Sequence, residues 1–257
     1  MPPTSSKPPP WPCAWRVGPR GRPGRPRSSL VSEPLPFGPG PAEAPPEGPC
    51  PRTAARLEAG RIVHGEAHRD RLAAGGATPW LEGAFQAAAE HFGQAPDGVV
   101  RLRYDAAGGR LWGAWEPLPA TPFPYRLLPL AHPLPPSDRP RLKGADGPWQ
   151  GPVLAAARAA GAQDAMLLWP DGTVAESAIA ALALEREGEL WVPPAGGRVA
   201  SLAEALDLPG WARKRGLLIR VGAFAPEALG SGRLWCLNAV RGLWQAESLP
   251  PLSPMKP

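Results

Sequence analysis

The order of hydrophobic and polar residues along the chain predicts short strands and helices in alternation. Strand-like patterns occur in TAARLEAGRIV, and in VVRLRY and RLWGAW, which the turn residues AAGG separate. Helical spacing occurs in HGEAHRDRLAAGG and in LEGAFQAAAEHF, which ends at Gly93. Thr78 and Pro79 match an N-cap and a first-turn proline for the second helix. We therefore predict a small domain of strands and helices over residues 53–130.

The second half of the chain repeats this mixture with clearer turns. An Ala-rich helix begins at 151–152, and the dipeptides Asp-Gly at 171–172 and Glu-Gly at 187–188 predict hairpin turns. Ser201 and Glu204 form a capping-box pattern before SLAEALDL, and LLIRVGAF has the composition of a buried strand. A Pro-rich connector at 117–140 separates the halves, so we predict a second domain over residues 140–250. The fold class is α/β in a mixed α+β arrangement, with two small α/β domains.

The beginning of the chain has a different composition. The first 51 residues hold 17 of the 39 prolines, and we predict that residues 1–52 are a disordered, low-complexity tail. Residues 1–56 carry eight Lys and Arg against three Glu, whereas residues 57–257 carry 20 residues of each sign. A basic tail could touch nucleic acid, but the neutral body shows no such footprint. We therefore expect either a solvated extension or upstream sequence translated from an over-long gene model, and no nucleic-acid partner.

Cysteine and histidine usage gives no sign of a metal site. Cys13, Cys50 and Cys236 form no CxxC pair, and although His64 and His68 are four residues apart, the residue after His64 is glycine, where zinc proteases have glutamate. The longest candidate apolar run, AIAALAL, is too short to span a membrane, and the N-terminus has no signal-peptide hydrophobic region. We expect a soluble, cytoplasmic protein without a metal.

Lys143 stands out among the basic residues. The chain has 24 arginines and four lysines, and Lys143 is the only lysine in the body of the chain without an adjacent basic residue. A primary amine can condense with an aldehyde, which a guanidinium cannot do. After Lys143 the pattern gives a helix, a strand that ends LLWPDGTV, and then Glu176, so that a lysine and a carboxylate lie at the ends of different elements.

This order resembles the class IV aminotransferases, which include branched-chain and D-amino acid aminotransferases and 4-amino-4-deoxychorismate lyase. GAQDAMLLWPDGTVAES is similar to the family pattern "aDEalllnxdGxVxE", RTAARLEAGRIVHGEAHRDRL to its N-terminal "ETlRlxxGrixxlxxHlxRL", and RLWCLNAVRGLWQAE to its later "vfxtNaxxgixpv". The resemblance covers roughly residues 53–249. It implies the D-amino acid aminotransferase-like fold and pyridoxal 5'-phosphate as cofactor.

The resemblance also implies roles for five residues. Lys143 would be the catalytic residue that forms a Schiff base with the cofactor, and Glu176 would keep the pyridine nitrogen protonated. Arg71 matches the phosphate arginine, and Asn238 and Ala239 match a segment whose backbone approaches the same phosphate. Deprotonation of Lys143 would be favoured by burial beside the cofactor.

Several positions depart from the family pattern. Ala180 and Ala181 lie where the family has an asparagine, RVASLAEAL lacks the glycine of "LpGixR", and either Tyr104 or Tyr125 could match the tyrosine beside the phenolic oxygen of the cofactor.

Among the family's activities we favour that of 4-amino-4-deoxychorismate lyase, which releases pyruvate and gives the folate precursor 4-aminobenzoate. A branched-chain or D-amino acid aminotransferase is the first alternative, and a non-catalytic relative that acts as a binding protein is the second. The resemblance implies a small-molecule amino substrate and a homodimer, with each site between the two domains of one subunit and edged by the other.

Overall fold

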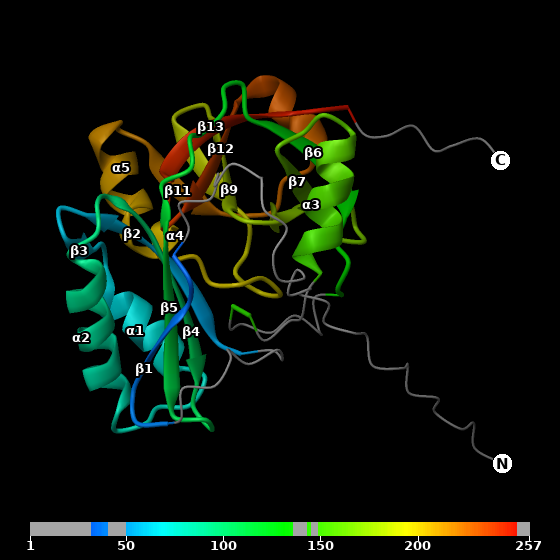
Figure 1. Cartoon of the computed structure of the whole chain (residues 1–257). Helices are drawn as coiled ribbons and strands as arrows, with labels where there is room; N and C mark the ends of the chain where they lie inside the picture. Colours follow the sequence, from blue (N-terminus) through cyan, green and yellow to red (C-terminus); the bar gives the residue numbers. More distant parts are fainter. Residues whose placement is uncertain (1–31, 41–49, 136–142, 145–148, 251–257) are drawn as a thin grey trace, which may run out of the picture.

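The computed structural model describes residues 32–40, 50–135, 143–144 and 149–250, and it forms two domains that each contain one sheet (Figure 1). The first sheet and its helices are called the small domain here, and the second sheet and its helices the large domain. The mixed α/β fold predicted from the sequence is confirmed.

The small domain is a five-stranded antiparallel sheet with helices on one face. Its strand order is β1-β5-β4-β2-β3. The alternation seen in the sequence sends Leu57, Leu102 and Leu111 to the face that helices α1 and α2 cover, where they join Leu72 and Phe85 in one buried core. The elements are β1 (Leu35–Phe37), β2 (Arg52–Glu58), β3 (Arg61–Ile62), α1 (Gly65–Ala73), α2 (Leu81–Phe92), β4 (Gly98–Asp105) and β5 (Arg110–Pro117).

The large domain is an eight-stranded mixed sheet that curls strongly. Its strand order is β11-β10-β9-β12-β13-β6-β7-β8. The curl brings its two edges together, since the Val174 amide of β8 donates to the Phe224 carbonyl just beyond β11. The strands are β6 (Arg126–Ala131), β7 (Asp164–Leu168), β8 (Val174–Ser177), β9 (Ala181–Arg186), β10 (Glu189–Val192), β11 (Leu218–Val221), β12 (Arg233–Asn238) and β13 (Gly242–Ser248).

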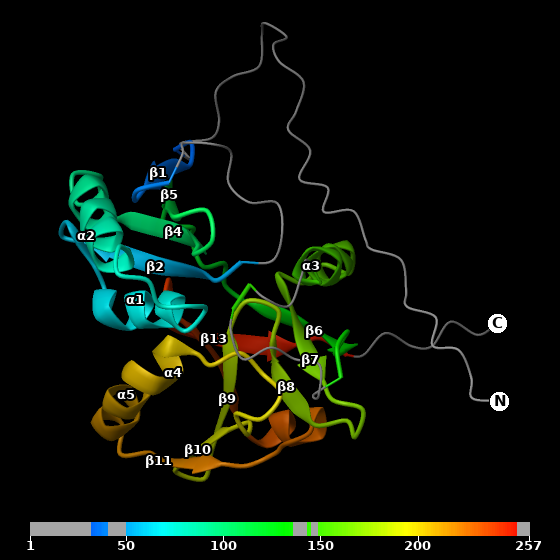
Figure 2. The same ribbon diagram turned by 90° about the horizontal axis from the view of Figure 1, so that it is seen from below.

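Three helices pack on one face of the curled sheet, over two separate apolar clusters, and a short 3-10 helix packs on the other face. Helix α3 (Gln150–Ala159) packs on β7, and helices α4 (Leu202–Leu206) and α5 (Leu208–Lys214) cover a second apolar cluster that contains Leu190 and Leu237. The short 3-10 helix η2 (Pro226–Ser231) precedes β12. In Figure 2, α1 of the small domain faces α4 and α5 of the large domain, where His64 Nε2 lies 2.7 Å from Asp207 Oδ1.

Most elements that the sequence predicts in the small domain are confirmed. The β2–β3 hairpin, helix α2 and the β4–β5 hairpin lie where the periodicity places them. The prediction that Thr78 caps α2 is wrong. The N-cap residue is Trp80, which makes no side-chain capping bond, and the Thr78 hydroxyl lies 2.8 Å from the Tyr104 hydroxyl instead. Ser201 does cap α4, by accepting a hydrogen bond from the Glu204 amide.

Three other predictions need correction. Residues 32–40 belong to the predicted disordered tail 1–52, yet they include β1, because the edge of β5 offers backbone partners to LPF; residues 1–31 and 41–49 lie outside the described residues. The first domain was predicted to end at residue 130, but it ends before β6. This strand pairs in parallel with β7 and β13 and therefore belongs to the large domain. Strand β11 is exposed rather than buried, since it forms the edge of that sheet. Within the part of the chain that the structure describes, no helix has the length and apolar character needed to cross a membrane.

Candidate active site

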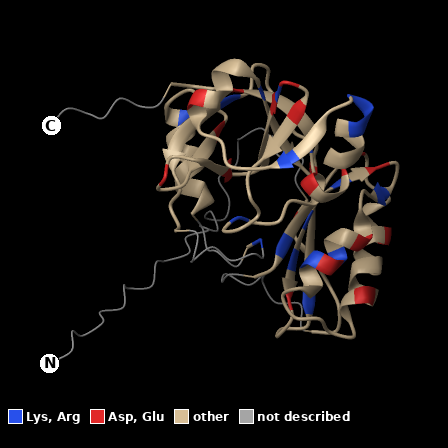
Figure 3. Cartoon of the chain, turned by 180° about the vertical axis from the view of Figure 1, so that it is seen from behind, with Lys and Arg blue, Asp and Glu red and all other residues tan. Residues whose placement is uncertain are grey.

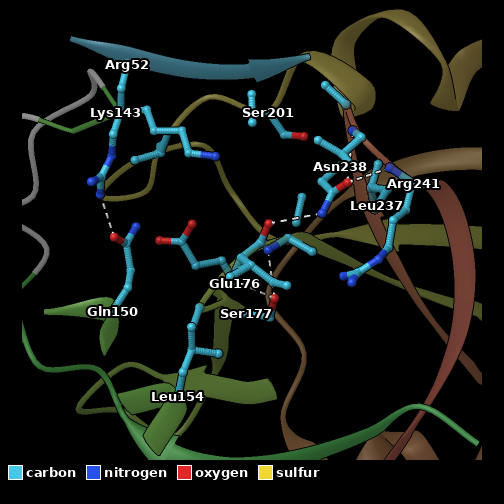
Figure 4. A pocket seen from close by; sticks show the side chains of 18 of the residues that line it. Arg52, Lys143, Gln150, Leu154, Glu176, Ser177, Ser201, Leu237, Asn238 and Arg241 are labelled. Carbon is cyan, nitrogen blue, oxygen red and sulfur yellow. Dashed lines mark hydrogen bonds between the residues drawn. The ribbon is translucent and has the colours of Figure 1, made fainter. Parts of the chain in front are cut away.

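A cavity of about 1850 Å³ lies between the two domains, and the close view in Figure 4 shows side chains of both converging on it. The five residues singled out in the sequence all line this cavity: Arg71, Lys143, Glu176, Asn238 and Ala239. They come from helix α1, from the segment before α3, from β8 and from the end of β12. Residues that are up to 168 positions apart, from Arg71 to Ala239, therefore share one space.

Backbone contacts with the small domain fix the position of Lys143. The Lys143 carbonyl accepts a hydrogen bond of 3.0 Å from the Arg52 amide at the start of β2. Gly144 follows with φ +96°, and a Cβ atom at Gly144 would lie 2.4 Å from the Cys50 carbonyl oxygen. Only glycine can adopt this positive φ angle and also lie this close to the Cys50 carbonyl. A glycine after Lys143 is therefore needed to keep the lysine in its position.

The electrostatic environment favours a neutral Lys143 amine. Burial, followed by the positive charges of Arg71, Arg52 and Arg101, lowers the pKa of Lys143 to about 8, and the opposing attraction of Glu176 is smaller. The side chain extends into the cavity, towards the space that the Glu176 carboxylate also enters (Figure 4). An amine with this pKa is partly deprotonated near neutral pH and can act as a nucleophile or a base.

Glu176 projects from β8 and is almost buried. The His132 Nε2 atom lies 3.7 Å from Glu176 Oε1, and the histidine ring stacks on Trp169 with a centroid distance of 4.6 Å. The His132 Nδ1 atom accepts a hydrogen bond from the Leu134 amide, so a neutral ring carries its proton on Nε2, which faces the carboxylate. Stacked aromatic rings thus lie behind the Glu176 carboxylate, and Glu176 lines the cavity.

Two tight turns form the floor of the cavity, and Asn238 joins them. The Asn238 side-chain oxygen accepts hydrogen bonds from the Val240 and Arg241 amides at 3.0 and 2.8 Å, and its NH₂ group donates to the Ile179 carbonyl at 3.3 Å. The Asn238 side chain therefore organises the backbone of both turns, and the cavity is lined there by small residues such as Ala239.

A buried carboxylate supports the first of these turns. Ser177 donates a hydrogen bond of 2.6 Å to Asp164 and accepts one of 2.8 Å from the Ala180 amide. Burial raises the pKa of Asp164 to about 6. This network shapes the stretch 177–180 after Glu176, including Ala180 where the family pattern has an asparagine.

Arg71 reaches across the domain boundary. It extends from α1 and donates to the Ala200 carbonyl in the loop before α4. Burial lowers the pKa of Arg71 to about 10, so the guanidinium stays charged at neutral pH. Next to it, His68 is fully buried and its Nδ1 atom lies 2.6 Å from the Thr53 hydroxyl, so His64 and His68 bind different partners, Asp207 and Thr53.

Comparison with protein families identifies the chain. A sequence model for amino-transferase class IV matches residues 53–249. The chain belongs to the class IV aminotransferase family. This match spans both domains and every candidate residue described above.

Solved structures of similar fold include enzymes of two kinds. A putative 4-amino-4-deoxychorismate lyase is 29% identical, with a TM-score of 0.64, over 82% of this chain and 91% of the other. 4-Amino-4-deoxychorismate lyase from Pseudomonas aeruginosa is 22% identical, with a TM-score of 0.65, over 85% and 92%. A hypothetical aminotransferase from Mycobacterium tuberculosis, with alpha-ketoglutarate and PMP bound, is 19% identical, with a TM-score of 0.68, over 79% and 83%. Comparison with curated protein sequences found no match.

Class IV aminotransferases depend on pyridoxal phosphate, and the cavity of this member suits that cofactor. When bound, pyridoxal phosphate supplies an aldehyde that an amine can attack and a ring that withdraws electrons. Lys143 offers an amine of lowered pKa, Glu176 a nearly buried carboxylate for the ring nitrogen, and Arg71 a charged fork for phosphate. These assignments of Lys143, Glu176 and Arg71, and those of Asn238 and Ala239 near the phosphate, stay predictions from the family motifs.

The structure also separates the two tyrosine candidates and adds two arginines that the sequence reasoning missed. Tyr125 lines the cavity, whereas Tyr104 lies in the small-domain core and donates to the Gly76 carbonyl, so Tyr125 is the better match for a cofactor tyrosine. Burial and the nearby Asp164 raise the pKa of Tyr125 above its usual value. Arg101 and Arg103 line the cavity too, and the alternation in VVRLRY was the signal that puts both on one face of β4.

Proposed function

We propose that the protein is a pyridoxal-phosphate-dependent lyase that acts as 4-amino-4-deoxychorismate lyase does, releasing pyruvate and leaving 4-aminobenzoate. The observation that carries the proposal is the meeting of Lys143, with its lowered pKa, and the nearly buried Glu176 in one cavity that Arg71 also lines. The lyase is favoured over an aminotransferase because the putative lyase is 29% identical to the chain, whereas the mycobacterial aminotransferase is 19% identical.

Lys143 would move the protons of this reaction. Its neutral Nζ atom takes the proton from the ring carbon that bears the substrate amine, and the bond between the adjacent ring carbon and the enolpyruvyl oxygen then breaks. Lys143 returns a proton to the methylene carbon of the leaving group, which becomes the methyl group of pyruvate. Glu176 would supply a carboxylate for the ring nitrogen of the cofactor, and Arg71 would hold the cofactor phosphate.

Two assays test the lyase against its first alternative. Purified protein loaded with pyridoxal phosphate should release pyruvate from 4-amino-4-deoxychorismate and should not exchange amino groups between branched-chain or D-amino acids and 2-oxoglutarate. The fold similarity to the mycobacterial aminotransferase makes the second assay necessary. Exchange without pyruvate release would reject the lyase and favour the aminotransferase.

A cofactor-binding assay tests whether the protein is an enzyme at all. Wild-type protein should take up pyridoxal phosphate, acquire a visible absorbance band and trap the cofactor covalently after borohydride reduction. Lys143→Ala should lose the covalent trapping, because the substitution removes the amine. A protein that takes up no cofactor in this test would instead be the non-catalytic binding relative.

We also propose that the protein acts as a homodimer on a small amino substrate, as the family resemblance implies. Light scattering coupled to gel filtration should give twice the chain mass of 27.1 kDa. A monomeric mass at micromolar concentration would reject the dimer without affecting the lyase.

A further inference from the structure

A histidine beside Glu176 has a hydrogen-bond donor without a partner. His132 directly follows β6, and its side chain is fully buried. Because the Leu134 amide donates to Nδ1 at 3.0 Å, the neutral ring carries its proton on Nε2. Among the described residues, Nε2 has no hydrogen-bond partner. A buried donor that stays unpaired costs free energy, so its presence calls for a functional reason.

This donor faces the Glu176 carboxylate. The His132 Nε2 atom lies 3.7 Å from Glu176 Oε1, which is somewhat longer than a hydrogen bond. Contacts between groups of an active site are often this long before a ligand binds, and they shorten when it does. Glu176 lines the cavity, whereas His132 lies outside its lining within the described part of the chain. The N–H group therefore approaches the carboxylate from within the large domain.

Packing fixes the direction of this N–H group. The His132 amide donates to the Leu168 carbonyl at 2.8 Å, which extends the pairing of β6 with β7 by one residue. The imidazole stacks on Trp169 with an angle of 27° between the rings, and the Trp149 ring lies 5.5 Å away, centroid to centroid. A ring that is buried against two indoles has little freedom to turn. The donor is thus aimed at Glu176 by the fold itself.

Charges on the other side of the cavity pull Glu176 in the opposite direction. Lys143 is attracted by Glu176, and Arg71 and Arg101 line the same cavity. Basic segments are visible along the strands of the small-domain sheet in Figure 3. These charges favour an ionised carboxylate, but they also draw it across the cavity, away from β8. A contact within the large domain is therefore expected to hold the carboxylate in one direction.

We infer that His132 is a positioning residue, which donates a hydrogen bond from Nε2 to Glu176 and so holds this carboxylate towards the ring nitrogen of pyridoxal phosphate. His132 acts through Glu176 and lies outside the motifs that relate the chain to its family. A neutral imidazole suits this task, because it adds a directional donor without a second full charge that would compete for the carboxylate. The inference rests on the proposed function for the role of Glu176.

The test uses two cofactors that differ only at the ring nitrogen. In 1-deazapyridoxal 5'-phosphate a carbon–hydrogen group replaces this nitrogen, while the aldehyde and the phosphate are kept. Isothermal titration of the full-length protein should show that His132→Asn weakens pyridoxal phosphate binding about tenfold, because a hydrogen bond to a charged group is lost. Asparagine keeps an acceptor for the Leu134 amide but is too short to reach Glu176. Affinity for the deaza analogue should change less than about twofold, since its ring does not require Glu176.

A rescue variant tests whether the N–H donor is the group that matters. Glutamine places its amide nitrogen near the position of the histidine Nε2 atom. His132→Gln should therefore restore pyridoxal phosphate affinity to within about threefold of the wild type. A loss in His132→Gln as large as in His132→Asn would overturn the inference.

His68→Asn is the matched control in the small domain. His68 is also fully buried, its Nε2 atom has no partner among the described residues, and its Nδ1 atom contacts Thr53. This substitution should change the affinities for the two cofactors by the same factor. Equal losses for both cofactors in His132→Asn, or an equally selective loss in His68→Asn, would overturn the inference, because the effect would then be structural.

Two further arms keep the outcome decisive. Circular dichroism checks that His132→Asn is folded, and if it is not, His132→Phe, which keeps a flat ring without an N–H group, is judged by the same comparison. Glu176→Gln separates this inference from the proposals on which it rests. A selective loss of pyridoxal phosphate in Glu176→Gln but not in His132→Asn rejects the inference alone, whereas equal losses for both cofactors in Glu176→Gln reject the role of Glu176 and the inference with it. Selective losses in both variants, without pyruvate release from 4-amino-4-deoxychorismate by the loaded wild type, support the inference and reject the lyase alone.

Discussion

The glycine that follows Lys143 is the residue on which the position of the lysine amine depends most directly. Gly144 has φ +96° and lies against the Cys50 carbonyl, whereas Gly172 has a similar φ of +83° with open space around it. We predict that Gly144→Ala destabilises the protein by more than the roughly 1–3 kcal/mol expected for the backbone angle alone, because the new Cβ also collides with backbone.

Gly172→Ala is the control for that prediction, since this substitution is destabilised only by the positive φ angle and not by a steric collision. Urea unfolding of both variants gives the two free energies, and titration with pyridoxal phosphate shows whether Gly144→Ala also loses the cofactor. Equal destabilisation by the two substitutions would contradict the proposed role of the contact with Cys50.

The charge of Lys143 gives a pH-dependent prediction. Its pKa falls from 10.5 in the unfolded chain to about 8 in the folded protein, so below pH 8 the folded state holds a charge in surroundings that disfavour it. This costs up to about 3 kcal/mol of stability at neutral pH, and the cost disappears as the pH rises from 8 to 10.5. Lys143→Met without cofactor should therefore be more stable than the wild type at pH 7.

Urea unfolding at pH 7, 9 and 10.5 measures the difference between Lys143→Met and the wild type, which should shrink towards the highest pH. The same substitution at Lys214, an exposed lysine of α5, should give no such trend. A gain from Lys143→Met that stays constant with pH would show that packing, and not charge, is its source.

At the scale of elements, the Asn238 side chain links the turn after β12 to the turn after β8. Asn238→Ala removes the acceptor of two backbone amides and the donor to the Ile179 carbonyl, and we expect a loss of about 2 kcal/mol together with weaker cofactor binding. Asn238→Asp keeps the acceptor and loses the donor.

Comparison of these two variants separates the two contributions. Stability of Asn238→Asp close to the wild type, with weaker cofactor binding, would assign the cofactor effect to the link between the turns. If both variants bind pyridoxal phosphate as the wild type does, the turns have no part in the cofactor site.

The elements that the sequence predicts well are those whose pattern depends on local packing. Alternation in VVRLRY and helical spacing in LEGAFQAAAEHF report one buried face each, and both elements are where expected. The prediction that LLIRVGAF forms a buried strand was wrong, because composition does not distinguish a central strand from an edge strand. The side chains of Leu218 and Val221 on β11 are 62% and 71% exposed. Strand β1 was missed because its three residues gain their order only from pairing with β5.

The candidate site shows the same limit at the level of residues. Motif order was enough to select Lys143, Glu176 and Arg71, and all three line the cavity. His132 and Arg103 carry no motif, and their relation to the cavity arises from the way two sheets face each other. Contacts between distant segments of this kind cannot be read from local periodicity.

At the scale of the whole molecule, the domains are joined through helix α1. His64, at the N-cap of α1, bonds Asp207 between α4 and α5, and both side chains are about one-third exposed, at 30% and 32%. A double-mutant cycle of His64→Ala and Asp207→Ala should give a coupling of roughly 0.5–1 kcal/mol, because solvent screens the pair only in part.

A matched pair within one domain provides the comparison. Arg69 lies on α1 and bonds Glu82 of α2 at 2.7 Å, entirely inside the small domain. Hydrogen exchange should speed up in both α1 and α4 when the pair of His64 and Asp207 is broken, but in the small domain alone when Arg69→Ala is made. Unchanged exchange in α4 in the first case would show that this pair does not couple the domains.

The hydrogen bond from the Arg52 amide to the Lys143 carbonyl has a consequence for how activity arises during folding. The amine of Lys143, the proposed nucleophile, is positioned by a contact with the small-domain sheet, whereas Glu176 lies on the large-domain sheet. Neither half of the chain can assemble a competent centre by itself, so catalytic competence should emerge only at the last stage of folding, when the halves dock.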